Sequence, residues 1–215
     1  MTLVDPAVVA ERAATVRTRL DTAGGADVRI VAVTKTFGPS AIDAAVAAGL
    51  DDIGENYAQE AAAKLTEITT TPTVHFIGRL QRNKVRQLAS HVDVWQTVDR
   101  PELATEIAKR APGAKVMIQV DISGEENKGG CGPDTTEDLV MHATGVGLEV
   151  IGLMGVALLA EPEAARPGFS LLRGLVDRLG LDECSMGMSA DLEIAVDEGA
   201  TMVRIGRDLF GERLG

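Results

Sequence analysis

A lysine directly follows the first strongly apolar run of the chain. Residues 28–34 are apolar on both faces apart from Arg29, and Lys35 comes next. A lysine that emerges at a strand end is partly desolvated, which favours its neutral amine, and a neutral amine attacks carbonyl groups. The same position also suits a lysine that is paired with a carboxylate at the rim of the fold. Lys35 is therefore a candidate nucleophile toward a carbonyl compound, with a structural cation as the alternative.

Two short turns near the end of the sequence have the composition of a phosphate site. Residues 185–189 hold two hydroxyls, Ser185 and Ser189, immediately before a predicted helix, and Gly206 ends a later apolar run. Helix starts of this kind offer free backbone N–H groups to an anion. Helix capping explains Ser189 equally well. The last two strand-to-helix turns of a barrel often bind phosphate, so the coincidence of both turns favours that function.

An arginine lies inside the last apolar run. Arg204 alternates with Val203 and Ile205, so it points to the opposite face from these two residues. If the apolar neighbours face a layer of helices, Arg204 faces the interior, where a guanidinium needs an acceptor or a flat partner. An internal salt bridge and a bound ligand both meet this need.

The other candidate groups point to no metal site. The three histidines are far apart in sequence, and neither cysteine belongs to a C-x-x-C pair or lies at metal-ligand spacing. These residues are His75, His91, His142, Cys131 and Cys184. We expect no bound metal and no disulfide framework, and a reducing cytoplasm is the simplest location.

The overall charge restricts the partners of this chain. Its 215 residues carry a formal charge of −11, which argues against a general affinity for nucleic acid or for an anionic membrane. The cations of residues 79–86 are better explained as a solvated face than as an anion or RNA contact; they are Arg79, Arg82, Lys84 and Arg86. No basic, apolar leader begins the chain, and no apolar window approaches a membrane span. We expect a soluble protein whose anion site is local.

The elements that position these residues alternate regularly between strand and helix. Eight short apolar runs are predicted strands: Val28–Thr34, Asp52–Gly54, Val74–Ile77, Val94–Val98, Lys115–Ile122, Glu149–Val156, Glu183–Met186 and Met202–Ile205. Stretches of helical periodicity precede the first strand and separate the others: Val8–Asp21, Pro39–Ala48, Ala58–Thr66, Asn83–Ser90, Pro101–Arg110, Thr136–Ala143, Ala164–Leu179 and Asp191–Glu198.

This alternation predicts one α/β domain over residues 1–215, a single (β/α)₈ TIM barrel. An open, doubly wound sheet is the alternative, and the absence of a G-x-G-x-x-G turn after the first strand argues against its nucleotide-binding form. In a barrel the active site lies at the carboxyl ends of the strands, where Lys35, Ser189 and Gly206 fall.

The motifs together resemble the pyridoxal-phosphate homeostasis protein family, also called the YggS/PROSC family. They occur in the family's order and span almost the whole chain. The matching stretches are Val31–Lys35, Gly54–Glu60, His75–Gly78 with Leu80, Gln81, Asn83 and Lys84, Gly152–Met154, Ser185–Ser189, and Met202–Gly206 with Phe210 and Gly211.

The resemblance implies a barrel like the N-terminal domain of alanine racemase, the type III fold of pyridoxal 5′-phosphate (PLP) proteins. Lys35 would hold the cofactor as an internal aldimine. Ser189 and the backbone of Gly206 and Arg207 would bind its phosphate, and Ser185 belongs to the same motif.

The resemblance also implies residues around the cofactor ring. Asn56 and Met154 would line the pocket, and Arg204 would face the pyridine nitrogen. A guanidinium donates hydrogen bonds but cannot act as an acid, so the ring nitrogen would stay unprotonated and the cofactor would be a poor electron sink. Two positions depart from the family pattern: Arg207 stands where other members often carry a hydroxyl residue, and Cys131 has no assignable role.

Three functions follow from this inventory. The resemblance implies a PLP carrier that buffers the cofactor, delivers it to PLP-dependent apo-enzymes and is not itself an enzyme; we expect a monomer. An amino-acid racemase is the alternative, but it needs a second base, and the one tyrosine, Tyr57, directly follows Asn56 at a helix start. A cofactor-free aldolase would use Lys35 with a proton shuttle such as Asp121.

Overall fold

The computed structural model describes residues 4–124, 129–157 and 161–211. Eight parallel strands close into a barrel in chain order. They are β1 (Arg29–Val33), β2 (Asp52–Glu55), β3 (Thr73–Phe76), β4 (Val94–Val98), β5 (Lys115–Val120), β6 (Glu149–Gly155), β7 (Glu183–Ser185) and β8 (Met202–Ile205). Because β8 pairs with β1 from Met202 to Ile205, the sheet has no free edge. The expected (β/α)₈ barrel is confirmed, and the open sheet is excluded.

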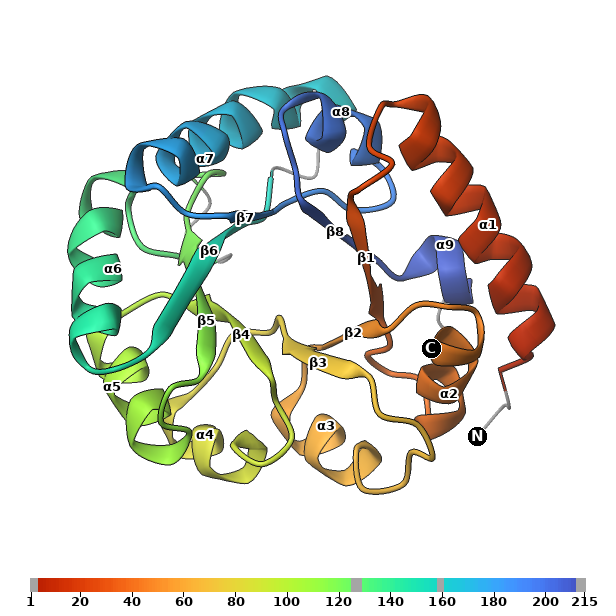
Figure 1. The fold of residues 1–215 in the computed structure, drawn as a ribbon, viewed down its shortest axis with the longest axis horizontal. Helices are drawn as coiled ribbons and strands as arrows, with labels where there is room; N and C mark the ends of the chain where they lie inside the picture. The colour runs from red at the N-terminus through yellow and green to blue at the C-terminus, as the bar shows by residue number, and fades with distance from the viewer. Residues whose placement is uncertain (1–3, 125–128, 158–160, 212–215) are drawn as a thin grey trace.

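Helices form a ring around the strands (Figure 1). They are α1 (Pro6–Thr22), α2 (Pro39–Ala47), α3 (Ala58–Lys64), α4 (Arg82–Leu88), α5 (Pro101–Arg110), α6 (Thr136–Gly145), α7 (Arg166–Leu179), α8 (Leu192–Asp197) and α9 (Arg207–Phe210), with short 3₁₀ turns η1 (Pro133–Thr135) and η2 (Pro162–Ala165). The first of them begins at Asp5, whose carboxylate caps it by accepting from the backbone N of Ala7, 2.9 Å away.

Several strands end one or two residues earlier than the apolar runs predict. β5 ends at Val120 because Asp121 Oδ1 accepts from the backbone N of Ser123 at 3.0 Å and of Gly124 at 2.9 Å, which turns the chain away. The carbonyl of Cys131 accepts from Asp121 N at 2.9 Å, so the backbone of Cys131 pairs with the end of β5. The intervening residues 125–128 lie outside the described part.

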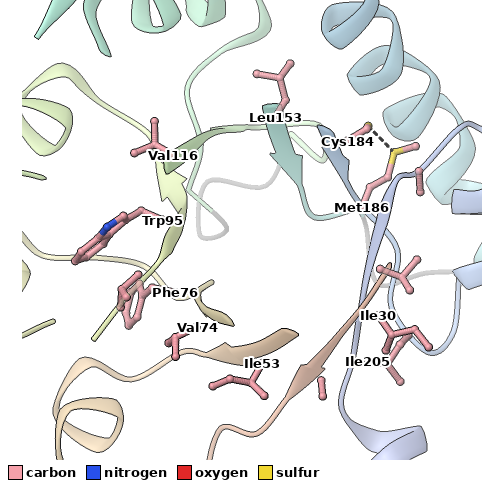
Figure 2. Close-up of a cluster of buried hydrophobic side chains, with 14 of the residues drawn as sticks. Ile30, Ile53, Val74, Phe76, Trp95, Val116, Leu153, Cys184, Met186 and Ile205 are labelled. Carbon is pink, nitrogen blue, oxygen red and sulfur yellow. Dashed lines mark hydrogen bonds between the residues drawn. The ribbon is translucent and has the colours of Figure 1, made fainter. Parts of the chain in front are cut away.

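The two faces of each strand differ in chemistry. Outward-facing side chains pack under the helices in one continuous apolar cluster; Figure 2 shows Trp95 and Phe76 on this face, with ring centroids 6.4 Å apart. Val203 and Ile205 belong to this cluster, so alternation along β8 directs Arg204 into the barrel. A smaller apolar cluster includes Met154.

Within the described ranges, no helix combines the length and the apolar character that a membrane crossing requires. The same residues include no group of three or more histidine, cysteine, aspartate or glutamate side chains arranged to hold a metal ion. Cys131 and Cys184 are both free thiols. Burial raises the pKa of the Cys184 thiol to about 12, so it stays protonated at neutral pH.

Candidate functional site

A cavity of about 710 Å³ opens among residues at the carboxyl ends of the strands. Seven of the eight predicted site residues line it, contributed by the ends of β1, β2, β6, β7 and β8. These residues are Lys35, Asn56, Met154, Ser189, Arg204, Gly206 and Arg207. The barrel therefore gathers side chains that are up to 172 positions apart in the sequence (207 − 35).

The described lining of this cavity is positively charged. Lys35, Arg79, Arg204 and Arg207 face one carboxylate, that of Asp191, which gives a local excess of three positive charges (4 − 1). The whole chain carries −11. The local charge of the described lining is thus opposite in sign to that of the whole chain, which favours an anionic ligand.

The loop that carries Lys35 is held by a buried ammonium group from α3. Lys64, only 4% exposed, donates to the carbonyls of Thr34 at 2.8 Å and Phe37 at 2.9 Å. Between them, Thr36 has φ +70°, a left-handed conformation that threonine rarely adopts. The backbone N of Thr36 donates to Glu60 Oε1 at 2.6 Å. These contacts fix the turn in which Lys35 lies.

Lys64 is itself paired with two carboxylates, both of which belong to the Gly54–Glu60 motif. Its Nζ lies 2.7 Å from Glu55 Oε1 and 2.9 Å from Glu60 Oε1. Glu55 is fully buried and also accepts from Thr34 Oγ1 at 2.5 Å. Burial raises the pKa of Glu55, while the ammonium of Lys64 opposes that change. The i,i+4 spacing of Glu60 and Lys64 was the only sequence signal for this cluster, and it suggests nothing more than a helix surface pair.

Arg204 is buried and forms no ion pair with the described residues. Its guanidinium donates to Ser185 Oγ at 2.8 Å and to the carbonyl of Gly155 at 2.7 Å, and no described carboxylate lies within salt-bridge distance. Burial lowers the pKa of Arg204 to about 10, although Asp191 acts in the other direction, so it remains a cation at neutral pH. The internal salt bridge that the sequence left open is not present among the described residues.

Ser185 does not line the cavity, in contrast to the other predicted residues. It pairs in register with Met202, two residues before Arg204, and so lies one layer deeper in the barrel. Its hydroxyl accepts from Arg204 and donates to Gln96 Oε1 at 2.7 Å. The structure places Ser185 where it supports Arg204.

The two predicted phosphate turns are joined by an arginine that the sequence did not reveal. Arg19 of α1 pairs with Glu193 of α8 at 2.8 Å and with Asp208 of α9 at 2.7 Å. It also donates to the carbonyl of Ser189 at 3.0 Å. One side chain thus ties together the turns that contain Ser189 and Gly206. Because Arg19 is 170 residues or more from these partners, no local pattern could have predicted the contact.

Two residues considered for proton transfer lie outside the described cavity lining. Tyr57 is 48% exposed and precedes α3. Asp121 turns its Oδ1 back onto its own loop, where it accepts from Ser123 and Gly124. Neither residue is placed as a second base beside Lys35.

Comparison with known proteins agrees with this geometry. The chain matches the family described as alanine racemase, N-terminal domain, over residues 4–214. It is 43% identical over 219 positions to the pyridoxal phosphate homeostasis protein of Pseudomonas aeruginosa, across 95% of this chain and 94% of that protein. The protein of the same name from Aquifex aeolicus is 41% identical over 198 positions, across 86% and 87% of the two chains.

A solved structure shows the same architecture with a ligand. PipY of Synechococcus elongatus with PLP bound is 32% identical to this chain and has a TM-score of 0.81, covering 94% of this chain and 100% of PipY. The barrel, the motifs around its cavity and the near-complete coverage in both directions lead to one assignment. This chain belongs to the family of pyridoxal phosphate homeostasis proteins, which are built on the barrel of the alanine racemase N-terminal domain.

Proposed function

We propose that this protein binds PLP in the cavity at the carboxyl ends of its strands and buffers and delivers it without turning over a substrate. The observation that carries the proposal is the joint presence, in one cavity with a positively charged described lining, of Lys35 and of a buried Arg204 that forms no ion pair with the described residues. PLP is small, flat and anionic, and it carries an aldehyde, a phosphate and a basic ring nitrogen. The cavity offers a group for each of these three features.

Each part of the cavity has a specific role in this proposal. When bound, PLP would supply an aldehyde, a group that reacts with a primary amine. Lys35 supplies that amine from a turn that Lys64 and Glu60 hold in place. Ser189, the backbone of Gly206 and Arg207 bind the phosphate, and Arg207 replaces the hydroxyl found in other members. Asn56 and Met154 complete the wall around the ring.

Arg204 favours a carrier over an enzyme. A guanidinium only donates hydrogen bonds, so a ring nitrogen that faces Arg204 accepts a hydrogen bond and gains no proton. Arg204 would thus leave a bound ring a weak electron acceptor, and reactions that form a carbanion on an amino acid need a strong one. The exposed position of Tyr57 supports the same conclusion, because racemisation needs a second base at the substrate. We propose that racemase-like turnover is at most a weak side reaction.

The proposal extends to the setting in which the protein works. We propose that residues 1–215 act as one PLP-binding unit, monomeric and cytoplasmic, with PLP-dependent apo-enzymes as recipients. Two free cysteines suit a reducing compartment, and the charge of −11 disfavours nucleic acid and anionic membranes as partners. Transfer is tested by following the activation of an apo-enzyme mixed with the loaded protein, against an equal concentration of free PLP.

The first test is the attachment of PLP to Lys35. We expect the wild-type protein to develop a yellow absorption band with PLP, and borohydride reduction followed by mass mapping to locate the adduct on Lys35. Lys35→Ala should lose the band. Lys109→Ala, which removes an exposed lysine of α5, should keep it. An adduct on another lysine, or equal binding by Lys35→Ala, would overturn the proposed site.

A further inference from the structure

Three fully buried polar side chains fill the barrel beneath the cavity. His75 of β3, Gln96 of β4 and Ser185 of β7 have no exposed surface. Gln96 Nε2 lies 2.8 Å from His75 Nδ1, and Ser185 Oγ lies 2.7 Å from Gln96 Oε1. Buried polar groups are costly unless they are hydrogen-bonded, and these three satisfy one another.

The three residues connect two charged groups at opposite levels of the barrel. Arg204 donates to Ser185 Oγ at 2.8 Å, and His75 Nε2 lies 2.7 Å from Asp52 Oδ1. Arg204 lines the cavity at the carboxyl ends of the strands. Asp52 and His75 line a second cavity, of about 820 Å³, among residues at the amino ends. We call the five residues Arg204, Ser185, Gln96, His75 and Asp52 the interior chain.

The chemistry of Arg204 fixes the direction of the first hydrogen bond, and the amide orientation of Gln96 fixes the others. A guanidinium can only donate, so Ser185 accepts from Arg204, and the one proton of Ser185 points to Gln96 Oε1. The amide NH₂ of Gln96 then faces His75 Nδ1, and its contact with Met202 Sδ at 3.1 Å agrees with this orientation. His75 Nδ1 must therefore be unprotonated, and His75 Nε2–H donates to Asp52. All four hydrogen bonds point from the cation to the carboxylate.

We propose that Gln96 and His75 are positioning residues that orient Arg204 toward the ring of the bound cofactor, and that Asp52 anchors them from the other end of the barrel. The proposal rests on the proposed function, because it assigns these residues to the same PLP site. The interior chain restricts the Ser185 hydroxyl to one orientation, in which its lone pairs face Arg204. Neither Gln96 nor His75 lines the cavity, so any effect on PLP acts through Arg204.

The first test compares two neighbouring residues of β4. Gln96→Leu removes the acceptor of the Ser185 proton, and we expect a shifted absorption band of bound PLP and an affinity about fivefold lower, the equivalent of one lost hydrogen bond. Thr97→Val is the matched control: Thr97 is also buried, belongs to the next position on the strand, and its Oγ1 has no partner among the described residues. It should leave both quantities unchanged.

A conservative variant separates positioning from packing. Gln96→Glu keeps an oxygen that accepts from Ser185, so we expect it to retain the wild-type band and affinity. The same variant offers a second oxygen to His75 Nδ1 and should make the imidazole a double donor. If Gln96→Glu behaved like Gln96→Leu, or if Gln96→Leu behaved like Thr97→Val, the positioning role would be wrong.

The second test needs no cofactor. With His91→Gln and His142→Gln as background, His75 is the only histidine, and nitrogen-15 NMR reports its tautomer directly. We expect the Nε2–H form with Nδ1 unprotonated, both without and with PLP. The Nδ1–H form would overturn the interior chain. If the wild-type protein failed to bind PLP while this tautomer was observed, the proposed function would be wrong, but the hydrogen bonds of the interior chain would be confirmed.

Discussion

Lys64 illustrates how a side chain outside the cavity determines the geometry inside it. Its ammonium group is buried and contacts two carboxylates and two carbonyls, all within 2.9 Å. Removing one partner of a buried ion pair costs more than the pair contributes, because the remaining charge is left in a medium of low polarity. At this position the remaining charge would be Glu55, directly beside the turn that holds Lys35.

We predict that Lys64→Met lowers the free energy of unfolding by about 3 kcal/mol and slows the formation of the yellow PLP complex. Without Lys64, burial raises the pKa of Glu55 further above its unfolded value, so the folded state binds this proton more tightly. The loss of stability should therefore grow as the pH rises above the ordinary pKa of a glutamate carboxyl, because deprotonation then costs more in the folded state than in the unfolded state. Denaturant unfolding at several pH values measures it, with Lys109→Met as control. A loss below about 1 kcal/mol at pH 8 would contradict the argument.

At the scale of elements, α1 holds the last two helices, α8 and α9, in a fixed position relative to each other. It packs against α2, α8 and α9, and its Arg19 joins Glu193 to Asp208 (Figure 1). These ion pairs are partly exposed, so their contribution to global stability is about 1 kcal/mol or less. Their consequence is geometric, because the turns that they connect hold Ser189 and Gly206.

We predict that Arg19→Met weakens PLP binding about tenfold while changing the free energy of unfolding by only about 1 kcal/mol. Arg17→Met is the control on the same helix, since Arg17 donates to the carbonyls of Ala26 and Val28 and, among the described residues, makes no hydrogen bond or ion pair with either turn. PLP titration followed by absorbance measures the affinity of both variants. Equal losses of affinity in the two would show that α1 acts through stability alone.

The elements were predictable from sequence to a greater extent than the contacts between them. All eight strands and the closed barrel follow from apolar runs and their spacing, because a short apolar run indicates a buried strand without any knowledge of distant contacts. The strand ends were predicted less accurately. For example, β5 stops at Val120, because the next residue, Asp121, forms a turn with Ser123 and does not continue the strand. Ser185 belongs to the predicted phosphate motif, but its depth in the barrel depends on its register with Met202, which the sequence alone does not give. Lys64 and Gln96 were missed because, apart from Glu60 on the same helix as Lys64, the partners that we describe for them come from other strands and loops.

At the scale of the whole molecule, the surface offers little apolar area for self-association. The large apolar side chains that are exposed among the described residues are Val8, Tyr57, Met141 and Leu171. Val8, Met141 and Leu171 belong to α1, α6 and α7, and Tyr57 precedes α3. Scattered residues of this kind are normal on a monomer, whereas stable dimers bury continuous patches.

We therefore predict a monomer that stays monomeric when PLP binds. Sedimentation velocity over a hundredfold range of protein concentration, with and without PLP, measures this directly. Because the net charge of −11 adds repulsion between copies, raising the salt concentration is the stringent condition. A dimer that forms with increasing concentration would contradict the prediction, and so would one induced by PLP.

The pairing of β8 with β1 determines when, during its synthesis, the protein can begin to bind PLP. Lys35 leaves the ribosome early, but the barrel closes only after β8 has been made, and β8 carries Arg204 and leads to Gly206. A nascent chain that ends before β8 contains Lys35 but lacks Arg204, Gly206 and Arg207 of the cavity lining. Because the cavity lining comes from both ends of the barrel sequence, we expect chains truncated before β8 to bind PLP poorly.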